Sequence, residues 1–461
     1  MNTKTRNILT SIIASLASNA HFGFQISLIN AFSVPLQKFY FSSFKIKLLS
    51  DLTSQNEEFS WSLLASTTFL GAFLGSLTSS RLINRFGPRT CLLLSSLIIC
   101  IACSGSTASI FLSSELFFIL RLITGIGIGL GNSVQPIYMA HISPENLKGA
   151  VGSISGFSGS ICFFLTSFLG IPSILGELYF LVFVFEALLA AIHTVCNVTI
   201  LNECPLYLTK RGKFEKANRC LNYHHGDTGI TVEDLKLELK NEIQFGLREL
   251  VKDRASIRAL SLAVALNFAV AFSGIVPVSF FGTIHFKNIG FSETSSSIAN
   301  CLSVLAAILG SFVAFVYLDK IGRRFLIISS LAALALINVW MMLLIAIFEK
   351  SNENVISWLF LALFVLFLFV FNAGIGPSAL FLGSELSNNQ ASSTIQSISI
   401  GIQNLASVIC PVLYFTLQRV SPHYSMLLFI VPLVMISVYF HGFLPETAGR
   451  TKAEVLKELA K

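Results

Sequence analysis

The chain has 461 residues, of which 54% are hydrophobic and only 12% are charged. Soluble domains have about 25% charged residues, so this composition argues against a soluble protein and favours one that crosses a membrane many times. The net charge of +7 comes from basic residues in short loops and one central segment, so we expect no nucleic-acid partner.

The apolar residues form runs of about 20, the length that a helix needs to cross a hydrocarbon core of about 30 Å. The first run follows Lys4 and Arg6 and continues to about Pro35 without a small-residue cleavage pattern. We therefore interpret it as a membrane helix and not as a signal peptide. We predict an all-α membrane protein with twelve transmembrane helices, near residues 8–34, 60–82, 91–112, 116–139, 150–170, 178–201, 259–281, 293–318, 325–347, 355–382, 393–416 and 424–443.

One long polar segment divides these helices into two sets of six. It contains TVEDLKLELKNEIQFGLREL, whose acidic and basic residues at helical spacing predict short surface helices. Lys and Arg gather on the side of this segment and of both chain ends, so the positive-inside rule predicts cytoplasmic termini. We expect an N-terminal half at 1–201, a cytoplasmic linker at 202–257, a C-terminal half at 258–443 and a cytoplasmic tail at 444–461.

Two loops at equivalent places in the halves share one residue order. Residues 84–89 (NRFGPR) join the second and third helices, and residues 319–324 (DKIGRR) join the eighth and ninth. The positive-inside rule explains the basic residues but not the shared order. Glycine permits a tight turn, and the basic residues can cap helix ends or pair with carboxylates. The repetition indicates a duplication, which is typical of transporters with a site between their halves.

Several further motifs follow one another in a characteristic order. They are FGFQISLINA in the first helix, Arg121-Leu-Ile-Thr-Gly in the fourth, PIYMAHISP at 136–144, LKGA at 147–150, Ser273-Gly-Ile in the seventh and PETAGRT at 445–451. With these motifs the chain resembles, almost end to end, the sugar porters of the major facilitator superfamily, especially the animal facilitative glucose transporters. The resemblance implies alternating access, a sugar-like substrate and a multi-pass location, which we expect to be the plasma membrane.

The resemblance also implies an intracellular network of acidic and basic residues that holds the outward-open state. In this chain the corresponding positions are Asn84, Arg85, Gly87, Arg89, Lys148, Glu203, Asp319, Arg323, Arg324, Glu385, Glu446 and Arg450. Four positions depart from the family. His141 replaces a glutamate, Lys148 and Leu206 each replace an arginine, and Ser393 stands where an arginine is expected. We therefore predict a weaker cytoplasmic gate than is usual in the family.

The sugar site departs further from the family. Gly156, Val270, Ala271, Val276 and Ala307 stand where the family has glutamines and asparagines in helices five, seven and eight. Each lost partner leaves a sugar hydroxyl unpaired, at about 1–3 kcal/mol, so we do not expect the family's affinity for glucose. The substrate-binding residues that remain are Phe22, Gln25, Asn267, Ile275, Phe371, Asn372 and Asn404.

Two interpretations of the remaining amides stay open. Gln25, Asn267, Asn372 and Asn404 can form a rearranged polar site in a cavity that is otherwise apolar. Alternatively, Asn267 and Asn404 only hydrogen-bond neighbouring helices, at about 0.6 kcal/mol each, and the cavity suits a less polar ligand. In the tenth helix, Gly374, Gly376 and Pro377 interrupt the helical pattern, which predicts a hinge, with glycine packing as the alternative.

Energy coupling is predicted from the first helix. Proton-coupled sugar porters carry an aspartate where this chain has Gln25, and an amide cannot take up a proton, so we expect a uniporter. Glu186 and His193, seven residues apart in the sixth helix, are the candidates for an alternative proton relay. We favour the alternative over a relay, namely a polar interhelical contact for Glu186 and a backbone carbonyl partner for His193.

We therefore predict facilitative movement of a hexose or related small solute. The alternatives are a proton-coupled or non-sugar carrier, and a transport-inactive nutrient sensor. No nucleophile, base and orienting group cluster outside the spans, so we do not expect an enzyme. The expected partners are a sugar-like small molecule and the lipid bilayer, and the oligomeric state is open. The nine cysteines form no CxxC pair and mostly lie in apolar runs, so we expect no disulfide, no metal and no cofactor.

Overall fold

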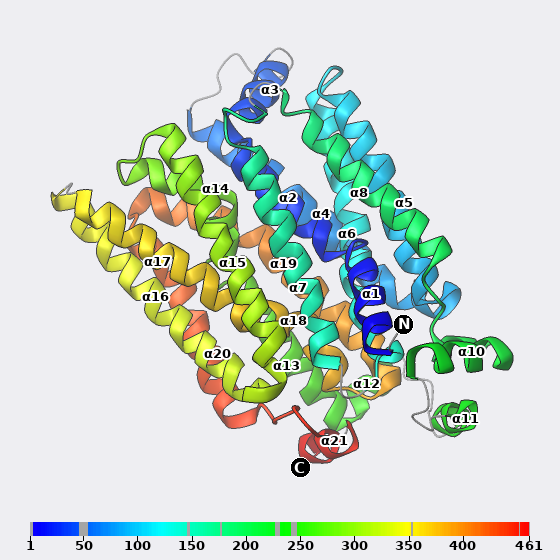
Figure 1. The fold of residues 1–461 in the computed structure, drawn as a ribbon. Coiled ribbons are helices and arrows are strands. Elements are labelled where there is room, and N and C mark those ends of the chain that lie inside the picture. The colour runs from blue at the N-terminus through cyan, green and yellow to red at the C-terminus, as the bar shows by residue number, and fades with distance from the viewer. Residues whose placement is uncertain are drawn as a thin grey trace.

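The computed structural model describes residues 3–45, 54–144, 148–175, 178–225, 231–240, 247–351, 354–450 and 452–460, and over these residues the fold is helical. The long helices lie side by side in two adjacent groups, one from each half of the sequence (Figure 1). The N-terminal group contains α1 (Thr3–Ser15), α2 (Asn19–Ala31), α3 (Ser33–Lys45), α4 (Ser54–Phe86), α5 (Pro88–Ser109), α6 (Ser114–Ile142), α7 (Lys148–Leu169) and α8 (Leu181–Thr199).

Four short helices follow in the polar segment, α9 (Pro205–Lys210), α10 (Phe214–His225), α11 (Val232–Lys240) and α12 (Leu247–Lys252). The C-terminal group contains α13 (Arg254–Ala271), α14 (Ile275–Asn288), α15 (Glu293–Ile321), α16 (Arg323–Ser351), α17 (Asn354–Ala373), α18 (Ile375–Glu385), α19 (Asn389–Val420), a 3₁₀ turn at Tyr424–Met426 and α20 (Leu427–Phe443). The last helix is α21 (Lys452–Ala460). We call the end of the molecule that carries α9–α12 and α21 the linker end, and the opposite end, which carries α3, the α3 end (Figure 1).

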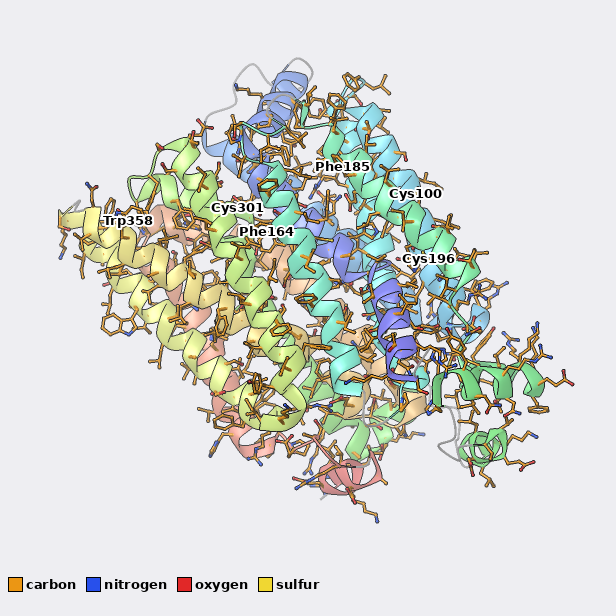
Figure 2. The ribbon with its side chains drawn as sticks, viewed as in Figure 1. Cys100, Phe164, Phe185, Cys196, Cys301 and Trp358 are labelled. Atoms are coloured by element: carbon orange, nitrogen blue, oxygen red, sulfur yellow. The ribbon has the colours of Figure 1, made fainter. Side chains whose placement is uncertain are left out.

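Length and apolar composition identify the helices that can cross a membrane. Among the described residues ten helices or joined helices meet this test, and the bent pair α1–α2 raises the number to eleven. Helix α7 contains a shorter apolar stretch at Ile154–Leu169. Large apolar side chains such as Phe185 and Trp358 are exposed on the outer faces (Figure 2), as expected for helices that face lipid. The chain is therefore a multi-pass membrane protein, as its composition predicts.

Three of the predicted membrane helices are interrupted, and the sequence marks only the interruption in the tenth, with Gly374, Gly376 and Pro377. The first bends by 41° between α1 and α2, the seventh is broken between α13 and α14, and the tenth is broken at Gly374 between α17 and α18. Polar side chains satisfy the carbonyls that these breaks release: Ser95 Oγ donates to Ala17 O at 2.8 Å, and Asn338 Nδ2 donates to Ser273 O at 3.0 Å. Such partners make an interruption tolerable in apolar surroundings.

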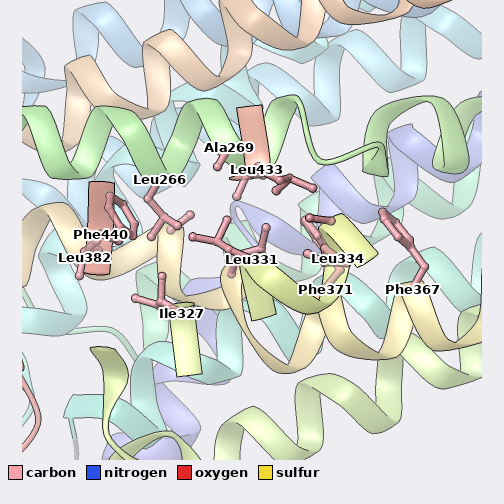
Figure 3. Close-up of a cluster of buried hydrophobic side chains, with 14 of the residues drawn as sticks. Leu266, Ala269, Ile327, Leu331, Leu334, Phe367, Phe371, Leu382, Leu433 and Phe440 are labelled. Atoms are coloured by element: carbon pink, nitrogen blue, oxygen red, sulfur yellow. The ribbon is translucent and has the colours of Figure 1, made fainter. Parts of the chain in front are cut away.

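Each half has a hydrophobic core of its own. In the C-terminal half, Leu266 and Ala269 of α13 lie among leucine and phenylalanine side chains from α16, α17, α18 and α20 (Figure 3). In the N-terminal half, Leu28 of α2 belongs to a separate cluster that includes Phe117 and Phe183. Burial of a leucine or phenylalanine side chain contributes about 1.5–3 kcal/mol. Because these cores lie mainly within the halves, each half can keep its packing while the contact between halves changes.

At the linker end, α1 is joined to α10 by polar contacts. Asn7 Nδ2 donates to His224 O at 2.8 Å, and His224 Nδ1 donates to Asn7 Oδ1 at 3.0 Å. The Arg6 guanidinium lies 4.8 Å from the centre of the Tyr223 ring. Burial, with smaller contributions from the nearby charges of His225 and Arg6, lowers the pKa of His224 from its ordinary value of 6.5 to about 4. The imidazole is therefore neutral in the folded protein near pH 7.

The lowered pKa predicts acid sensitivity. Below pH 6.5 the unfolded chain binds a proton on His224 before the folded chain does. The contribution of His224 to the free energy of unfolding is therefore constant above that pH and falls as the pH falls towards 4. At pH 5 the loss is about 2 kcal/mol. We expect His224→Asn to flatten the dependence of the melting temperature on pH between 7.5 and 5, as measured by thermal unfolding in detergent. The exposed His441, changed to Asn, is the control and should keep the wild-type slope. Equal slopes for the wild type and His224→Asn would contradict the assignment.

Candidate functional site

A cavity lies between the two halves and holds about 790 Å³ of empty space, part of it open to solvent. Its walls come from α2, α4 and α7 of the N-terminal half and from α13, α14, α17, α18 and α19 of the C-terminal half. The lining residues are Asn19, Phe22, Gly23, Ile26, Phe69, Gly156, Gly159, Ser160, Phe163, Val270, Ile275, Val276, Ser279, Phe371, Asn372, Gly376, Pro377, Leu380, Gln403 and Ser407. None of these described residues is charged, so the cavity suits a neutral solute.

The helix breaks supply much of this lining. Asn19 is the first residue of α2, Ile275 is the first of α14, and Gly376 is the second of α18. The residues that begin each helix after its break therefore face the cavity. Discontinuous helices that begin beside a site between two halves are typical of membrane transporters.

Four of the predicted substrate-binding residues line the cavity, namely Phe22, Ile275, Phe371 and Asn372. Asn372 is the polar member of this group. Its Oδ1 accepts a hydrogen bond from Ser160 Oγ at 3.2 Å, and its Nδ2 donates to Leu368 O at 2.9 Å. The Asn372–Ser160 contact joins α17 to α7 and therefore links the two halves at the cavity.

The other three predicted residues lie away from the cavity, which corrects the sequence interpretation. Asn267 Nδ2 donates to Ala263 O at 2.8 Å, and Asn404 Nδ2 donates to Ile400 O at 3.0 Å. Both bonds are to the carbonyl one turn earlier in the same helix. Gln25 belongs to a separate buried network. The structure therefore does not bring these three amides together with Asn372.

The sequence interpretation missed the polar residues that face the cavity in their place. They are Asn19, Ser160, Ser279, Gln403 and Ser407. One residue along a helix turns the side chain by about 100°, so Gln403 faces the cavity and Asn404 does not. The sequence does contain a sign of this face, because Gln403 and Ser407 are four residues apart and therefore lie on one side of the helix. The interpretation that placed Asn404 towards the site turned this side away from it.

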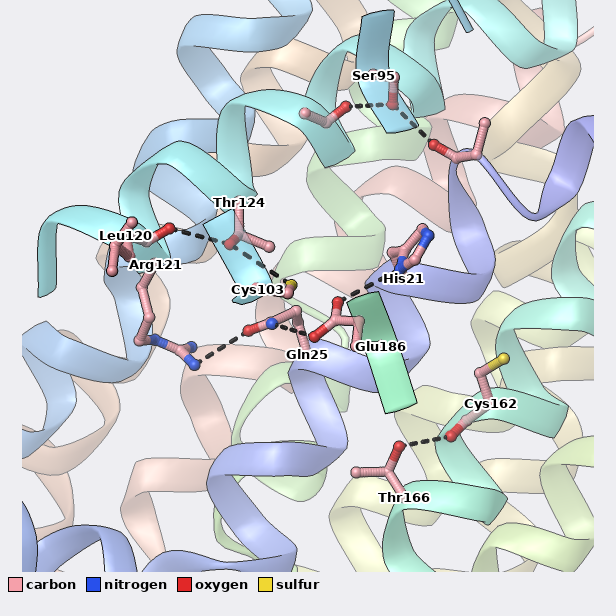
Figure 4. A network of polar contacts seen from close by, with 12 residues as sticks. His21, Gln25, Ser95, Cys103, Leu120, Arg121, Thr124, Cys162, Thr166 and Glu186 are labelled. Atoms are coloured by element: carbon pink, nitrogen blue, oxygen red, sulfur yellow. Dashed lines mark hydrogen bonds and ion pairs between the residues drawn. The ribbon is translucent and has the colours of Figure 1, made fainter. Parts of the chain in front are cut away.

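Gln25 lies in a buried polar network inside the N-terminal half (Figure 4). Its Nε2 donates to Glu186 Oε2 at 2.6 Å, and its Oε1 accepts a bond from Arg121 Nη1 at 3.1 Å. His21 Nδ1 lies 3.4 Å from Glu186 Oε1. The amide therefore bridges a buried cation and a buried anion, which compensate each other in a site without solvent. Arg121 contacts this network and not the cavity.

Glu186 and His193 are not joined by a hydrogen bond or an ion pair. His193 Nδ1 pairs with the Ser96 hydroxyl of α5, whereas Glu186 contacts α2. Glu186 therefore makes the polar interhelical contact that the sequence suggested, and His193 pairs with a hydroxyl and not with a backbone carbonyl. The geometry does not support a relay that runs directly between these two residues.

The two repeated loops at the linker end share one structural device. Glu203 Oε1 accepts a hydrogen bond from the Arg89 N–H at 3.0 Å, at the start of α5. Glu446 accepts from the Arg323 and Arg324 N–H groups at 2.9 and 3.2 Å, at the start of α16. A carboxylate at a helix N-terminus satisfies free N–H groups and interacts favourably with the helix dipole. The second loop therefore repeats the residue order of the first, and in both a carboxylate caps the helix that follows the loop.

The glycine of each loop makes room for the carboxylate. Gly87 has φ +90° and Gly322 has φ +96°, a region that other residues rarely adopt. A Cβ atom on Gly87 would lie 2.8 Å from Glu203 Oε2, and one on Gly322 would lie 2.8 Å from Glu446 Oε2. Burial raises the pKa of Glu203, and hydrogen bonds from the Cys204 and Arg89 N–H groups oppose this effect. The shared glycine is therefore required by the turn and by the carboxylate together.

The remaining residues of the predicted network lie at the same end. The Arg89 guanidinium donates to Asn197 O at 2.9 Å, Arg324 Nη2 donates to His441 O at 2.7 Å, and Arg450 pairs with Glu458 at 2.6 Å. Arg323 pairs with Glu385 within the C-terminal half. Asn84 and Arg85 are exposed. The side chains of Lys148 and Asp319 lie outside the described residues.

Hydrogen bonds join the halves on both sides of the cavity. Towards the α3 end, Asn30 Oδ1 accepts from the Thr283 hydroxyl at 2.7 Å, and Asn30 Nδ2 donates to Asn300 Oδ1 at 3.1 Å. A second cavity, with about 1570 Å³ of empty space, opens beyond this contact. Towards the linker end, the Ser79 and Ser397 hydroxyls of α4 and α19 lie 3.0 Å apart. The central cavity is therefore bounded by contacts between halves at both ends.

The capping carboxylates predict a specific effect on stability. Glu446→Ala removes the acceptor for several partly buried main-chain N–H groups, so we expect a loss of about 1–3 kcal/mol and a lower melting temperature. Glu446→Gln keeps one oxygen and should lose less. The matched control is Glu349→Ala, because Glu349 is exposed and, among the described residues, pairs with His423 alone, and it should change stability by less than about 0.5 kcal/mol. A wild-type melting temperature for Glu446→Ala would contradict this account of the cap.

Comparison with known proteins agrees with this architecture. The family model described as "Sugar (and other) transporter" matches residues 10–459. The chain is 25% identical to a "Facilitated glucose transporter homolog" of Caenorhabditis elegans, over 95% of this chain and 87% of the relative. It is 24% identical to facilitated glucose transporter member 7 of solute carrier family 2 from Mus musculus, over 98% of this chain and 90% of the relative.

Among solved structures, the proton:xylose symporter XylE bound to 6-bromo-6-deoxy-D-glucose has a TM-score of 0.82 to this chain at 21% identity. The likeness covers 99% of both chains and shows a common fold. Together with the family match over nearly the whole sequence, it establishes that the chain belongs to the sugar porter family of the major facilitator superfamily.

Proposed function

We propose that this protein is a facilitative uniporter that moves a neutral, sugar-like solute across a membrane by alternating access. The observation that carries the proposal is the uncharged cavity between the halves, lined by residues that directly follow three helix breaks. The names of its relatives support the solute class, because they are described as facilitated glucose transporters. Movement of the halves about this cavity would expose it first to one side of the membrane and then to the other.

The proposed topology has twelve spans, with α7 as the fifth, and cytoplasmic termini. Helix α7 supports this count because its apolar stretch packs within its own half and also against the other half. Asn19 of α2 donates to Ser155 O at 2.8 Å, and the Ser311 hydroxyl of α15 lies 2.8 Å from the Ser160 hydroxyl. The gathering of α1, α10–α12 and α21 at one end supports a common side for the termini (Figure 1), and the basic loops make that side cytoplasmic. The proposed location is the plasma membrane.

The proposed uniport mechanism is supported by the network around Gln25. An amide takes up no proton near neutral pH, and Gln25 bridges Arg121 and Glu186 so that their charges compensate each other. The solute gradient alone would then drive transport.

The proposed gates are the contacts that bound the cavity. Asn30, Thr283 and Asn300 would separate when the α3 end opens, and the Ser79–Ser397 contact would separate when the linker end opens. Hydroxyl–hydroxyl bonds contribute less than charge-assisted bonds, which supports a weaker cytoplasmic gate. Gly374, with Gly376 and Pro377, lies at the break between α17 and α18, and we propose that it acts as a hinge for α18.

The uniport proposal predicts the behaviour of purified protein in proteoliposomes. We expect saturable uptake of a radiolabelled monosaccharide that stops at equal concentrations inside and outside, because nothing drives it further. Unlabelled solute loaded inside should accelerate the entry of label, since the loaded carrier reorients in both directions. The measurement is uptake and counterflow with and without an inward pH gradient. Accumulation above equilibrium that depends on the pH gradient would contradict uniport.

A further inference from the structure

We propose that the solute is a neutral ring with few free hydroxyl groups, such as a deoxygenated or O-alkylated monosaccharide, and that Gln403 is the residue that selects it. This inference rests on the proposed transport function and specifies its substrate class. It follows from how the hydrogen-bonding capacity of the cavity is distributed among its walls.

Three of the polar lining residues are already hydrogen-bonded within the protein. Asn19 Nδ2 donates to Ser155 O at 2.8 Å, and Asn372 Nδ2 donates to Leu368 O at 2.9 Å. The Ser160 hydroxyl lies within 3.2 Å of Asn372 Oδ1 and within 2.8 Å of the Ser311 hydroxyl. Most of these bonds join helices to one another, and together they use part of the hydrogen-bonding capacity of the three side chains.

Gln403 differs from them because its carboxamide oxygen is buried and has no partner among the described residues. Its side chain lines the cavity with 9% of its surface exposed, and its Oε1 makes no hydrogen bond to any described residue. An unpaired polar atom in an apolar site is unfavourable unless a ligand or water completes its bonds. A solute hydroxyl is suited to this position, because a carboxamide can both accept and donate.

Two hydroxyl groups extend this polar edge. Ser407 lies one helical turn after Gln403 on α19, and Ser279 faces the cavity from α14. Neither hydroxyl is hydrogen-bonded within the described part of the chain. Gln403, Ser407 and Ser279 all belong to the C-terminal half, so the unsatisfied polar groups gather on one side of the cavity.

Most of the other lining side chains are apolar. The apolar ones are Phe22, Ile26, Phe69, Phe163, Val270, Ile275, Val276, Phe371, Pro377 and Leu380. A fully hydroxylated hexose carries hydroxyl groups around its whole ring, and those that face these side chains would lose their water without gaining a partner. Each such hydroxyl lowers affinity by about tenfold. A ring with hydroxyls along one edge avoids this loss and gains apolar contact on the other.

The test compares three labelled probes in proteoliposomes that contain the full chain: D-glucose, 6-deoxy-D-glucose and 3-O-methyl-D-glucose. We expect kcat/KM for at least one of the two substituted sugars to exceed that for D-glucose by tenfold or more. In Gln403→Leu, kcat/KM for the preferred probe should fall at least tenfold, mainly through a higher KM. In Ser407→Ala the fall should be smaller but in the same direction.

Gln418→Leu is the matched control, because Gln418 has the same side chain on the same helix and does not line the cavity. It should keep the wild-type kcat/KM. The melting temperature of every variant is measured, and if Gln403→Leu does not fold, Gln403→Met and Ser407→Ala carry the test.

The outcomes separate this inference from the proposed function. Equal or better transport of D-glucose overturns the substrate class and leaves facilitative sugar transport standing. A preference for a substituted sugar that survives in Gln403→Leu overturns the assignment of Gln403. Failure of folded protein to transport any of the three probes overturns the proposed function, and the inference with it.

Discussion

In a lipid bilayer every main-chain N–H and C=O group must find its partner inside the protein, so a helix can be interrupted only where protein supplies that partner. This constraint explains where the cavity lies. The Ala17 carbonyl is satisfied by Ser95, the Ser273 carbonyl by Asn338, and the Gly374 carbonyl by the Ser378 hydroxyl at 2.8 Å. Each interruption turns the following helix so that its first residues face the space between the halves. The cavity is therefore a consequence of three breaks whose polar groups are satisfied.

The same requirement fixes the parts of the protein that do not need to move. Glu203 and Glu446 satisfy N–H groups at the starts of α5 and α16, and both carboxylates occupy space that a glycine leaves free. These caps and the two separate cores make each half a coherent unit. The halves meet through polar contacts, such as Asn30 with Thr283, and through apolar contacts, such as the Phe69 and Phe280 rings at 5.5 Å. Relative motion of the halves thus requires rearranging these contacts while the caps persist.

The sequence predicts the features that depend on local pattern. It does not predict which way a side chain points, or which distant helix supplies its partner. Apolar length predicts the membrane helices, and the glycine shared by the two loops predicts the repeated turn. Glycine and proline mark the break at Gly374, but no such residue marks the break before Asn19, which depends on Ser95 from another helix. Gln403 faces the cavity where Asn404 was expected to, because neighbouring residues in a helix point about 100° apart. Apolar periodicity alone does not resolve such a difference. The partners of Gln25 lie on α6 and α8, and only the fold brings them together.

The central claim is that the two ends of the cavity open in turn. Electron–electron distance measurements test it most directly in a cysteine-free background that still transports. One pair of spin labels, at Val34 and Ile298, reports on the α3 end, and a second pair, at Phe86 and Ile321, reports on the linker end; all four side chains are exposed. The account predicts that transported solute shifts the two distance distributions in opposite directions. Distances that lengthen together, or that both stay unchanged while transport proceeds, would contradict it.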